Sequence, residues 1–311
     1  MTSWPPFIVA VLYVLDVSPE LRTALIEYMD ERVSVMNRTF VVAECGSGHD
    51  MSLEKARRMV VAAKDAGADA AKFQFWSSGS RMARRRHAPQ YEDVYIHYAI
   101  SRSWLDVLRV HCADVGIAFM CSAYLPEDVG IVAEHVDTLK IASFEANDPE
   151  LLAAHVQPVR AGKDVLISLG LGGSHRVVDE YLTTHTIDRR CGSIRFLHCV
   201  SAYPAPETEL NLANLRGVDG HSYWGFSDHT HAFQIMTGAL AVAAGAKTIE
   251  RHMRAEDTLT TNPDFHHAMP PDLFTLYVDN IRWAESVMGT RTRTSPDCEA
   301  PLRAFRVVEE Q

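Results

Sequence analysis

The chain has 311 residues, of which 47% are hydrophobic, and a formal net charge of −10. Its length and apolar content allow one large core, and its acidic balance argues against nucleic acid as the main partner. The cysteines have no paired spacing, so we expect reduced thiols in a cytoplasmic protein; they are Cys45, Cys112, Cys121, Cys191, Cys199 and Cys298.

Residues 1–38 are predicted to form an N-terminal extension. The apolar stretch 6–15 is too short to span a bilayer and lacks the flanks of a signal peptide, so we expect no membrane partner. Ser18 can cap an amphipathic helix over residues 19–33. Met36 directly precedes the first clear strand, so residues 1–35 are either an appendage or follow an upstream start.

From residue 39 onward, short runs typical of β-strands alternate with segments that have room for helices. The runs are 39–44, 69–74, 117–122, 138–143, 164–169, 193–199, 223–228 and 247–252. Gly67 and Gly245 each end a predicted helix directly before a strand. A long loop follows the last strand, and a further helical pattern then runs from Pro271 to Met288.

This alternation predicts an α/β protein, a (β/α)8 TIM barrel over residues 39–290, with a C-terminal tail at 291–311. A doubly wound open sheet is the alternative, but no Gly-x-Gly-x-x-Gly or Walker loop follows a strand. In a barrel the carboxyl ends of the strands carry the chemistry. Polar side chains stand there on nearly every strand: Glu44, Lys72, Gln74, Ser122, Lys140, Ser143, Ser168, Ser201, Tyr203, Ser227, Asp228, His229, Glu250 and His252.

Two of these side chains, His229 and His252, end neighbouring predicted strands separated by an Ala-rich helix. Two adjacent imidazoles without an evident third ligand predict a divalent metal with open coordination positions. Lys72 and Lys140, with several serines and a Gly-rich turn, suit a doubly charged anion. Singly, each residue is as well explained by a cap, an ion pair or a core contact; their concentration at one barrel end indicates a site for phosphoenolpyruvate chemistry.

The motifs resemble those of the sialic acid synthases, which condense phosphoenolpyruvate with an open-chain sugar aldehyde and release phosphate. The matching stretches are VAECGSGHDMSLEKA (42–56), AGADAAKFQ (66–74), LKIASFE (139–145), LISLGL (166–171), LHCVSAYPAP (197–206), GFSDHT (225–230), IERHM (249–253) and NPD (262–264). The resemblance implies a transferase of carbohydrate biosynthesis whose partners are two small molecules.

The resemblance also implies roles for individual residues. His229 and His252 would hold the divalent metal, with Mn2+ expected and Mg2+, Co2+ or Zn2+ as alternatives. Phosphoenolpyruvate would be bound by Lys72, Ser122, Lys140, Ser143, Ser168, Ser201 and Ser227. Glu44, Tyr203, Glu250 and Asp264 would act on the acceptor and the reacting carbons, with Glu44 stabilising positive charge at C2.

The chain departs from the family pattern at several points. Gly48-His49 replaces Asn-His, Ser201 replaces Asn, and FHHAM (265–269) follows the NPD motif. The family's C-terminal antifreeze-like domain, which gives an arginine to the acceptor's N-acyl group, is absent from the 311 residues. We therefore expect an aldehyde or open-chain sugar with its own negative charge, rather than N-acetylmannosamine. Gln74, Arg84 and Arg85 would bind it. The two arginines belong to a basic run, Arg84–Arg86 followed by His87, that a solvated loop explains equally well.

Two alternatives remain open at this point. One is another metal-dependent TIM-barrel aldolase or isomerase that uses the two histidines without phosphoenolpyruvate. The other is a non-catalytic barrel, which the retained Glu44, Lys72 and Lys140 disfavour. A homodimer would have to pair through barrel faces, with residues 6–15 as a candidate contact.

Overall fold

The computed structural model describes residues 38–171, 173, 178, 192–216, 224–289, 298, 299 and 301. The expected N-terminal helix, the apolar stretch 6–15 and nearly all of the tail at 291–311 lie outside these residues. The chain divides into a unit of Met36–Glu285 and a second unit of Met1–Val35 with Ser286–Gln311. The first unit contains the predicted barrel and is described below.

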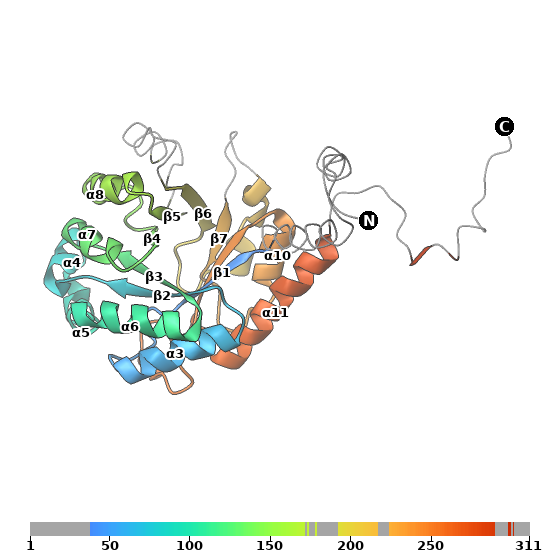
Figure 1. Cartoon of the computed structure of the whole chain (residues 1–311), viewed down its shortest axis with the longest axis horizontal. Coiled ribbons are helices and arrows are strands. Elements are labelled where there is room, and N and C mark those ends of the chain that lie inside the picture. The colour runs from blue at the N-terminus through green and yellow to red at the C-terminus, as the bar shows by residue number, and fades with distance from the viewer. Residues whose placement is uncertain are drawn as a thin grey trace, which may run out of the picture. The chain divides into compact units, whose positions relative to one another are not determined.

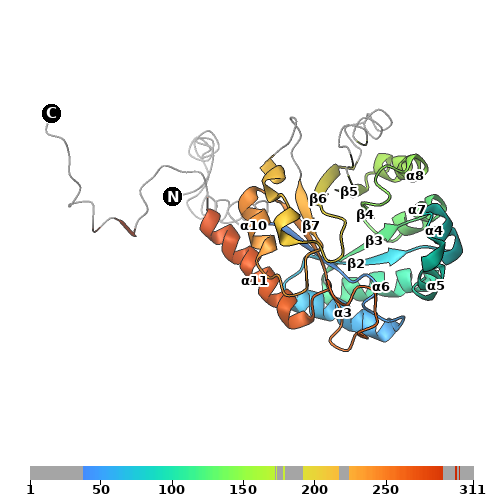
Figure 2. The same cartoon turned by 180° about the vertical axis from the view of Figure 1, so that it is seen from behind.

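Eight parallel strands close into a barrel in sequence order, and the last pairs with the first (Figures 1 and 2). They are β1 (Phe40–Glu44), β2 (Ala70–Phe75), β3 (Ala118–Ala123), β4 (Thr138–Ile141), β5 (Asp164–Leu169), β6 (Ile194–Cys199), β7 (Gly225–Asp228) and β8 (Thr248–His252). Every predicted strand is present with similar bounds, so the (β/α)8 barrel is confirmed and the open sheet was the wrong alternative.

Helices surround the strands in both views of the barrel (Figures 1 and 2). In chain order they are α3 (Leu53–Asp65), α4 (Gly79–Arg85), η1 (Pro89–Tyr91), α5 (Glu92–His97), α6 (Arg102–Val115), η2 (Pro126–Asp128), α7 (Val129–Ala133), α8 (Pro149–Arg160), η3 (Glu207–Glu209), η4 (Leu212–Arg216), α10 (Thr237–Ala244) and α11 (Pro271–Met288). Gly245 ends α10 with φ +117°, as its place before a strand predicts. No helix among the described residues combines the length and apolar character needed to cross a membrane.

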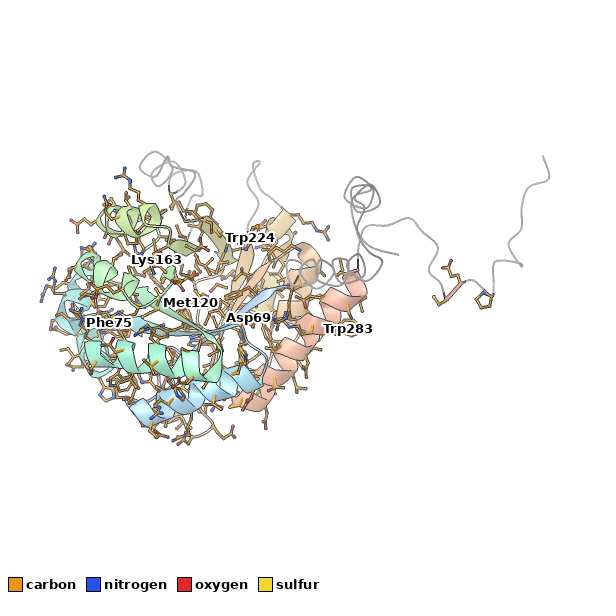
Figure 3. All side chains as sticks on the ribbon, viewed as in Figure 1. Asp69, Phe75, Met120, Lys163, Trp224 and Trp283 are labelled. Carbon is orange, nitrogen blue, oxygen red and sulfur yellow. The ribbon has the colours of Figure 1, made fainter. Side chains whose placement is uncertain are left out.

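The two faces of each strand build different parts of the core. Inward-facing Val42, Ala70, Met120, Leu166 and Leu197 form a small apolar cluster inside the barrel. The alternating outward side chains pack against the helices in the main core. Figure 3 labels Met120 of the inner cluster and Phe75 of the main core. Side chains two positions apart on a strand face the same way. The residue two positions after each of these five therefore also faces into the barrel, nearer the carboxyl end of its strand.

Asp228, a polar residue at a strand end, belongs to the packing between strands and helices and not to the interior of the barrel. It is fully buried and faces outward, where its Oδ1 accepts a hydrogen bond of 2.8 Å from Nη1 of Arg251. Its Oδ2 accepts another of 2.8 Å from the hydroxyl of Tyr277 on α11. Burial raises the pKa of Asp228, but the Arg251 guanidinium and hydrogen bonds from Thr237 and Thr230 outweigh burial, so the net pKa is lowered. This polar strand-end residue therefore ties β7 and β8 to the helical layer.

The close approach of β7 to β8 depends on Gly225. A methyl group there would lie 2.1 Å from the backbone oxygen of Thr248. We expect Gly225→Ala to lower the free energy of unfolding by about 2–3 kcal/mol, because the strands must separate to admit it. Gly130→Ala in α7 is the control: its methyl would meet nothing within 4 Å, and alanine favours helix by up to about 1 kcal/mol. Chemical denaturation of both variants measures the difference, and equal stabilities would contradict the packing argument.

Candidate active site

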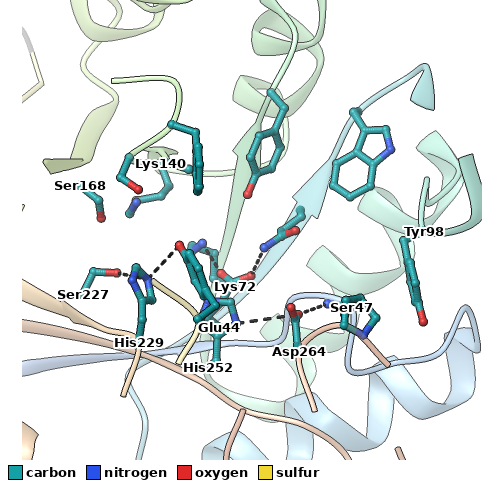
Figure 4. A pocket seen from close by; sticks show the side chains of 18 of the residues that line it. Glu44, Ser47, Lys72, Tyr98, Lys140, Ser168, Ser227, His229, His252 and Asp264 are labelled. Atoms are coloured by element: carbon teal, nitrogen blue, oxygen red, sulfur yellow. Dashed lines mark hydrogen bonds and ion pairs between the residues drawn. The ribbon is translucent and has the colours of Figure 1, made fainter. Parts of the chain in front are cut away.

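A pocket of about 350 Å3 lies at the carboxyl end of the barrel (Figure 4). Its volume is in the range of small-molecule sites. Most residues predicted for the site line it: Glu44, Lys72, Gln74, Lys140, Ser143, Ser168, Tyr203, Ser227, His229, Glu250, His252 and Asp264. Ser122 and Ser201 support lining residues instead, since Ser122 accepts a hydrogen bond of 3.2 Å from Lys72 and Ser201 shares one of 2.6 Å with Ser143.

Two lysines and two glutamates are buried together at the base of this pocket. Lys72 forms an ion pair with Glu44, its neighbour in the β1–β2 register, and its Nζ lies 3.6 Å from Oε2 of Glu250. Lys140 Nζ lies 3.8 Å from Oε1 of the same Glu250. All four are at most 4% exposed. Each charge is removed from water, so each depends on the others for compensation.

The two lysines are compensated to different degrees. Burial lowers the pKa of Lys72, but Glu250 and Glu44 outweigh burial and the net pKa is raised. For Lys140 burial prevails over the attraction of Glu250, so its pKa is lowered. Glu250 has a lowered pKa, because Lys140 and Lys72 outweigh its own burial. Lys140 thus has the less compensated ammonium group, which an incoming anion would stabilise.

Hydrogen bonds fix the orientation of the Glu44 carboxylate. Its Oε1 accepts from Nε2 of Gln74 at 2.8 Å and from the backbone N–H of Gly46 at 2.9 Å. Gln74 was predicted to bind the acceptor; in this structure it lines the pocket while holding Glu44 in place.

Hydroxyl groups surround Lys140 on one side of the pocket (Figure 4). Ser168 is buried, and its Oγ has no hydrogen-bond partner. Ser227 donates to Oε1 of Glu250 at 2.8 Å. Burying a hydroxyl without a partner is unfavourable, so the free Ser168 hydroxyl is suited to a ligand that supplies acceptor atoms.

His229 and His252 lie side by side as predicted, with ring centroids 5.7 Å apart. Nδ1 of His229 lies 2.8 Å from the backbone oxygen of Val200, which fixes the ring. Its Nε2 lies 3.2 Å from the Ser227 hydroxyl and 3.3 Å from that of Tyr203. Burial, with a smaller contribution from His252, lowers the pKa of His229 to about 3, so the imidazole is neutral and can coordinate a metal.

A second group of candidate ligands forms around His252. Asp264 and His267, both on the loop after β8, join it, and one ligand atom from each residue lies within 4.8 Å of the others. His267 was not among the predicted metal ligands. The unusual FHHAM stretch after NPD was its sequence signal, but two adjacent histidines left open which of them faces inward.

The basic run at 84–86 is arranged differently from the prediction. Arg84 is exposed, and Arg85 forms ion pairs with Asp148 and Glu150. Neither lines the pocket, so the expectation that these two arginines meet the acceptor there is not supported. Arg86, one residue beyond α4, turns into the pocket instead.

Arg86 is held by one carboxylate and several rings. Its Nε donates to Oε1 of Glu145 at 2.7 Å, and its Cζ lies 4.9 Å from the ring centroid of Phe144. Burial opposes its charge, but Glu145 outweighs burial and raises its pKa. The surrounding wall is aromatic: Trp76, Tyr91, Tyr95, Tyr98, Tyr124, Phe144 and Tyr203. Three of these, Tyr91, Tyr95 and Tyr98, come from the segment that begins with η1.

Comparison with known proteins identifies the family of this chain. A sequence model of the NeuB family matches residues 59–293. The chain belongs to the NeuB family. The N,N'-diacetyllegionaminic acid synthase of Legionella pneumophila is 29% identical, covering 86% of this chain and 78% of the relative. The human N-acetylneuraminate-9-phosphate synthase is 27% identical, covering 84% and 74%.

Solved structures agree on the fold of this NeuB-family chain. The N-acetylneuraminic acid synthetase of Leptospira borgpetersenii superimposes with a TM-score of 0.76 at 24% identity, covering 86% of this chain and 91% of that one. With the family assignment, the protein is a sialic acid synthase-like enzyme.

Lys72→Met tests the mutual dependence of the buried charges. It leaves Glu44 and Glu250 without their shared cation, and we expect a loss of about 3–5 kcal/mol in unfolding free energy at pH 7. In the wild type, Glu250 has a lowered pKa, so its contribution to stability is present above its unfolded pKa and is lost as pH falls. The difference between variant and wild type should therefore begin to shrink below about pH 4.5, the ordinary pKa of a glutamate, and should go on shrinking as the pH falls toward about 2, the pKa of Glu250 in the folded protein.

Lys163→Met is the matched control for Lys72→Met. Lys163 pairs at 3.1 Å with Asp137, whose side chain is fully exposed, so its removal should cost at most about 1 kcal/mol. Denaturation curves at several pH values give the comparison. A Lys72→Met loss as small as that of Lys163→Met would refute the buried-cluster interpretation.

Proposed function

We propose that this protein condenses phosphoenolpyruvate with an aldehyde or open-chain sugar and releases phosphate, using a divalent metal. The observation that carries the proposal is the pairing of under-compensated, buried Lys140 with the free hydroxyl of Ser168 in one pocket. A trianionic substrate would supply both the negative charge and the acceptor atoms that these groups lack.

The substrate's two anionic groups are assigned to two parts of the pocket. We place the phosphate at Lys140, Ser143, Ser168 and Ser227, where an ammonium group and hydroxyls converge. We place the carboxylate at Lys72, whose ammonium group donates to Ser122; Ser201 supports the first group through Ser143. This arrangement would hold the enol carbon at a fixed distance from the acceptor.

Glu44 and Tyr203 are suited to the chemical step. Gln74 and Gly46 aim the Glu44 carboxylate into the pocket, where it can stabilise positive charge developing at C2. Tyr203 lies beside His229 with its hydroxyl 3.3 Å from Nε2, placed to bind an acceptor oxygen. Glu250 holds Ser227 and both lysines in position.

The unpartnered, buried Nδ1 of His252 and the neutral His229 fit a divalent metal, for which we propose Mn2+. Such a metal, held by His252 with His229 or Asp264, would act as a Lewis acid that polarises the acceptor carbonyl. We also propose a cytoplasmic protein, on the support of four buried, free thiols among the described cysteines.

For the acceptor, we propose a sugar or aldehyde that carries its own negative charge. The support is Arg86, which replaces Arg84 and Arg85 in this role because it alone of the three lines the pocket. Its Nε donates to Glu145 and its Nη1 donates to the hydroxyl of Tyr95 at 3.3 Å. The remaining N–H groups of the guanidinium are left for a phosphate or carboxylate. The aromatic wall would cover the apolar faces of the sugar.

Phosphate release tests the proposal directly. The protein with Mn2+ and phosphoenolpyruvate should release phosphate when one member of a panel of neutral, carboxylated and phosphorylated aldoses is added. Mass spectrometry should find the condensed 2-keto acid. If calorimetry detects no phosphoenolpyruvate binding by the wild type, the aldolase or isomerase alternative is favoured.

Lys140→Ala should weaken phosphoenolpyruvate binding by about 1.5–3 kcal/mol, the range of a charge-assisted hydrogen bond. The reason is the loss of the ammonium group proposed to meet the phosphate. Lys163→Ala, on the surface, should leave the dissociation constant unchanged. Calorimetry on the two folded variants is the measurement, and an unaltered constant for Lys140→Ala would remove this residue from the phosphate site.

Arg86→Met should raise the acceptor KM about three- to tenfold, with less effect on the KM for phosphoenolpyruvate, because a partly exposed guanidinium contributes a screened interaction. Arg85→Met is the control, since its ion pairs lie outside the pocket. Arg86→Lys separates charge from the fork-shaped donor set. A larger change for Arg85→Met than for Arg86→Met would reverse the assignment.

A further inference from the structure

Tyr124 is the first residue after β3, and the alternation of that strand directs its side chain into the pocket. Met120 belongs to the apolar cluster inside the barrel, and Ser122, two positions further, accepts the hydrogen bond from Lys72. Side chains two positions apart on a strand face the same way. Tyr124 continues this inward series and lines the pocket.

Neighbouring side chains fix the ring of Tyr124. The ring of Trp76 meets it edge to face, with centroids 5.5 Å apart, and Cζ of Arg86 lies 5.3 Å from its centroid. The backbone N–H of Tyr124 donates to the backbone oxygen of Phe75 at 3.3 Å. The side chain is mostly buried, because the residue is 6% exposed. The direction of its hydroxyl is therefore set before any ligand arrives.

The hydroxyl of Tyr124 lacks the partners that other tyrosines of the pocket have. The hydroxyls of Tyr95, Tyr98 and Tyr203 each lie 3.3–3.4 Å from a nitrogen of another side chain. That of Tyr124 has no hydrogen-bond partner among the residues that the structure describes. A buried tyrosine hydroxyl usually finds a partner, and leaving one without is unfavourable. A ligand in the pocket would supply it.

The charges around Tyr124 keep its hydroxyl protonated. Burial raises the pKa of Tyr124, the carboxylates of Glu44 and Glu145 raise it further, and Arg86 only partly opposes them. Glu44 lies at the base of the pocket, whereas Glu145 and Arg86 belong to its wall. The hydroxyl thus stands between the buried charges and Arg86, as a neutral group that can donate to an anionic oxygen.

We propose that the Tyr124 hydroxyl donates a hydrogen bond to the negatively charged group of the acceptor, beside Arg86, and so helps to select the acceptor; the inference rests on the proposed function. A phosphate or a carboxylate has several acceptor oxygens, so a guanidinium and a phenol can bind the same group. Arg86 supplies charge, and Tyr124 supplies a donor of fixed direction. An acceptor without the charged group would leave both donors unpaired, and the site would disfavour it.

Three open-chain polyols serve as probes: sorbitol, which is neutral, gluconate, which has a carboxylate, and sorbitol 6-phosphate. None has an aldehyde, so binding to the full-length protein is measured by calorimetry without phosphoenolpyruvate and without reaction. The wild type should bind at least one charged polyol about tenfold more tightly than sorbitol. Tyr124→Phe keeps the ring and should weaken that binding about tenfold, as expected for a hydrogen bond to a charged group, with sorbitol unaffected.

Tyr277→Phe is the matched control. It removes the same atom from a buried tyrosine outside the pocket, whose hydroxyl donates to Asp228 at 2.8 Å. It should lower the melting temperature and leave polyol binding unchanged. Tyr124→Phe should do the opposite, because it removes a hydroxyl that has no partner in the unliganded protein.

A double variant tests whether Tyr124 and Arg86 meet the same group. Tyr124→Phe combined with Arg86→Met should weaken binding of the charged polyol by less than the product of the two single effects, because the two donors act on one anion. A loss equal to that product would place Tyr124 on another part of the ligand and contradict the proposal.

Circular dichroism establishes that each variant is folded, and Tyr124→Met is measured if Tyr124→Phe is not. The proposal is overturned if the wild type does not prefer a charged polyol, if the folded Tyr124 variant binds it like the wild type, or if sorbitol binding falls equally. A charged-polyol defect in a protein that releases no phosphate from phosphoenolpyruvate would uphold the anion contact and reject the proposed reaction. Phosphate release with unaltered polyol binding would do the reverse.

Discussion

The mutual compensation of four buried charges is the constraint on which this active site depends. Lys72 stands between Glu44 and Glu250, and Lys140 shares Glu250 with it. None of these groups could be buried alone without a large desolvation penalty. The charges nearly cancel within the barrel, yet Lys140 is left with a lowered pKa and a partly unmet demand for negative charge. In the proposed function, a trianionic substrate would supply the negative charge that the other three groups do not supply to Lys140.

The closed barrel brings these four side chains together. Parallel strands in sequence order bring eight carboxyl ends around one axis, and the period of two aims alternate residues inward. Consecutive residues on one strand therefore have different roles. Ser227 faces the pocket and binds Glu250, whereas Asp228 faces the helices and binds Arg251. Residues that line the pocket and residues that stabilise the barrel therefore alternate along one strand. A shift of the strand register by one residue would exchange the two sets.

The barrel strands carry the buried lysines and glutamates of the pocket, and two loops add further side chains to it. The segment after β2 contributes Arg86 and much of the aromatic wall, and the loop after β8 contributes Asp264 and His267. Loops at this end of a barrel vary without disturbing the core. In the proposed function, the groups that would bind the acceptor on the loop after β2 therefore lie on a different segment from Lys140 and the serines that would bind the phosphate.

The sequence by itself determined the eight strands, the barrel and most of the pocket, because strand periodicity and helix-ending glycines are local properties that act through neighbouring residues. It also placed His229 and His252 together, since adjacent parallel strands must end side by side. Only the tertiary structure decided which member of the Arg84–Arg86 run enters the pocket and which of His266 and His267 joins Asp264. Those outcomes depend on how irregular loops fold back over the barrel, where no periodic pattern specifies the direction of a side chain.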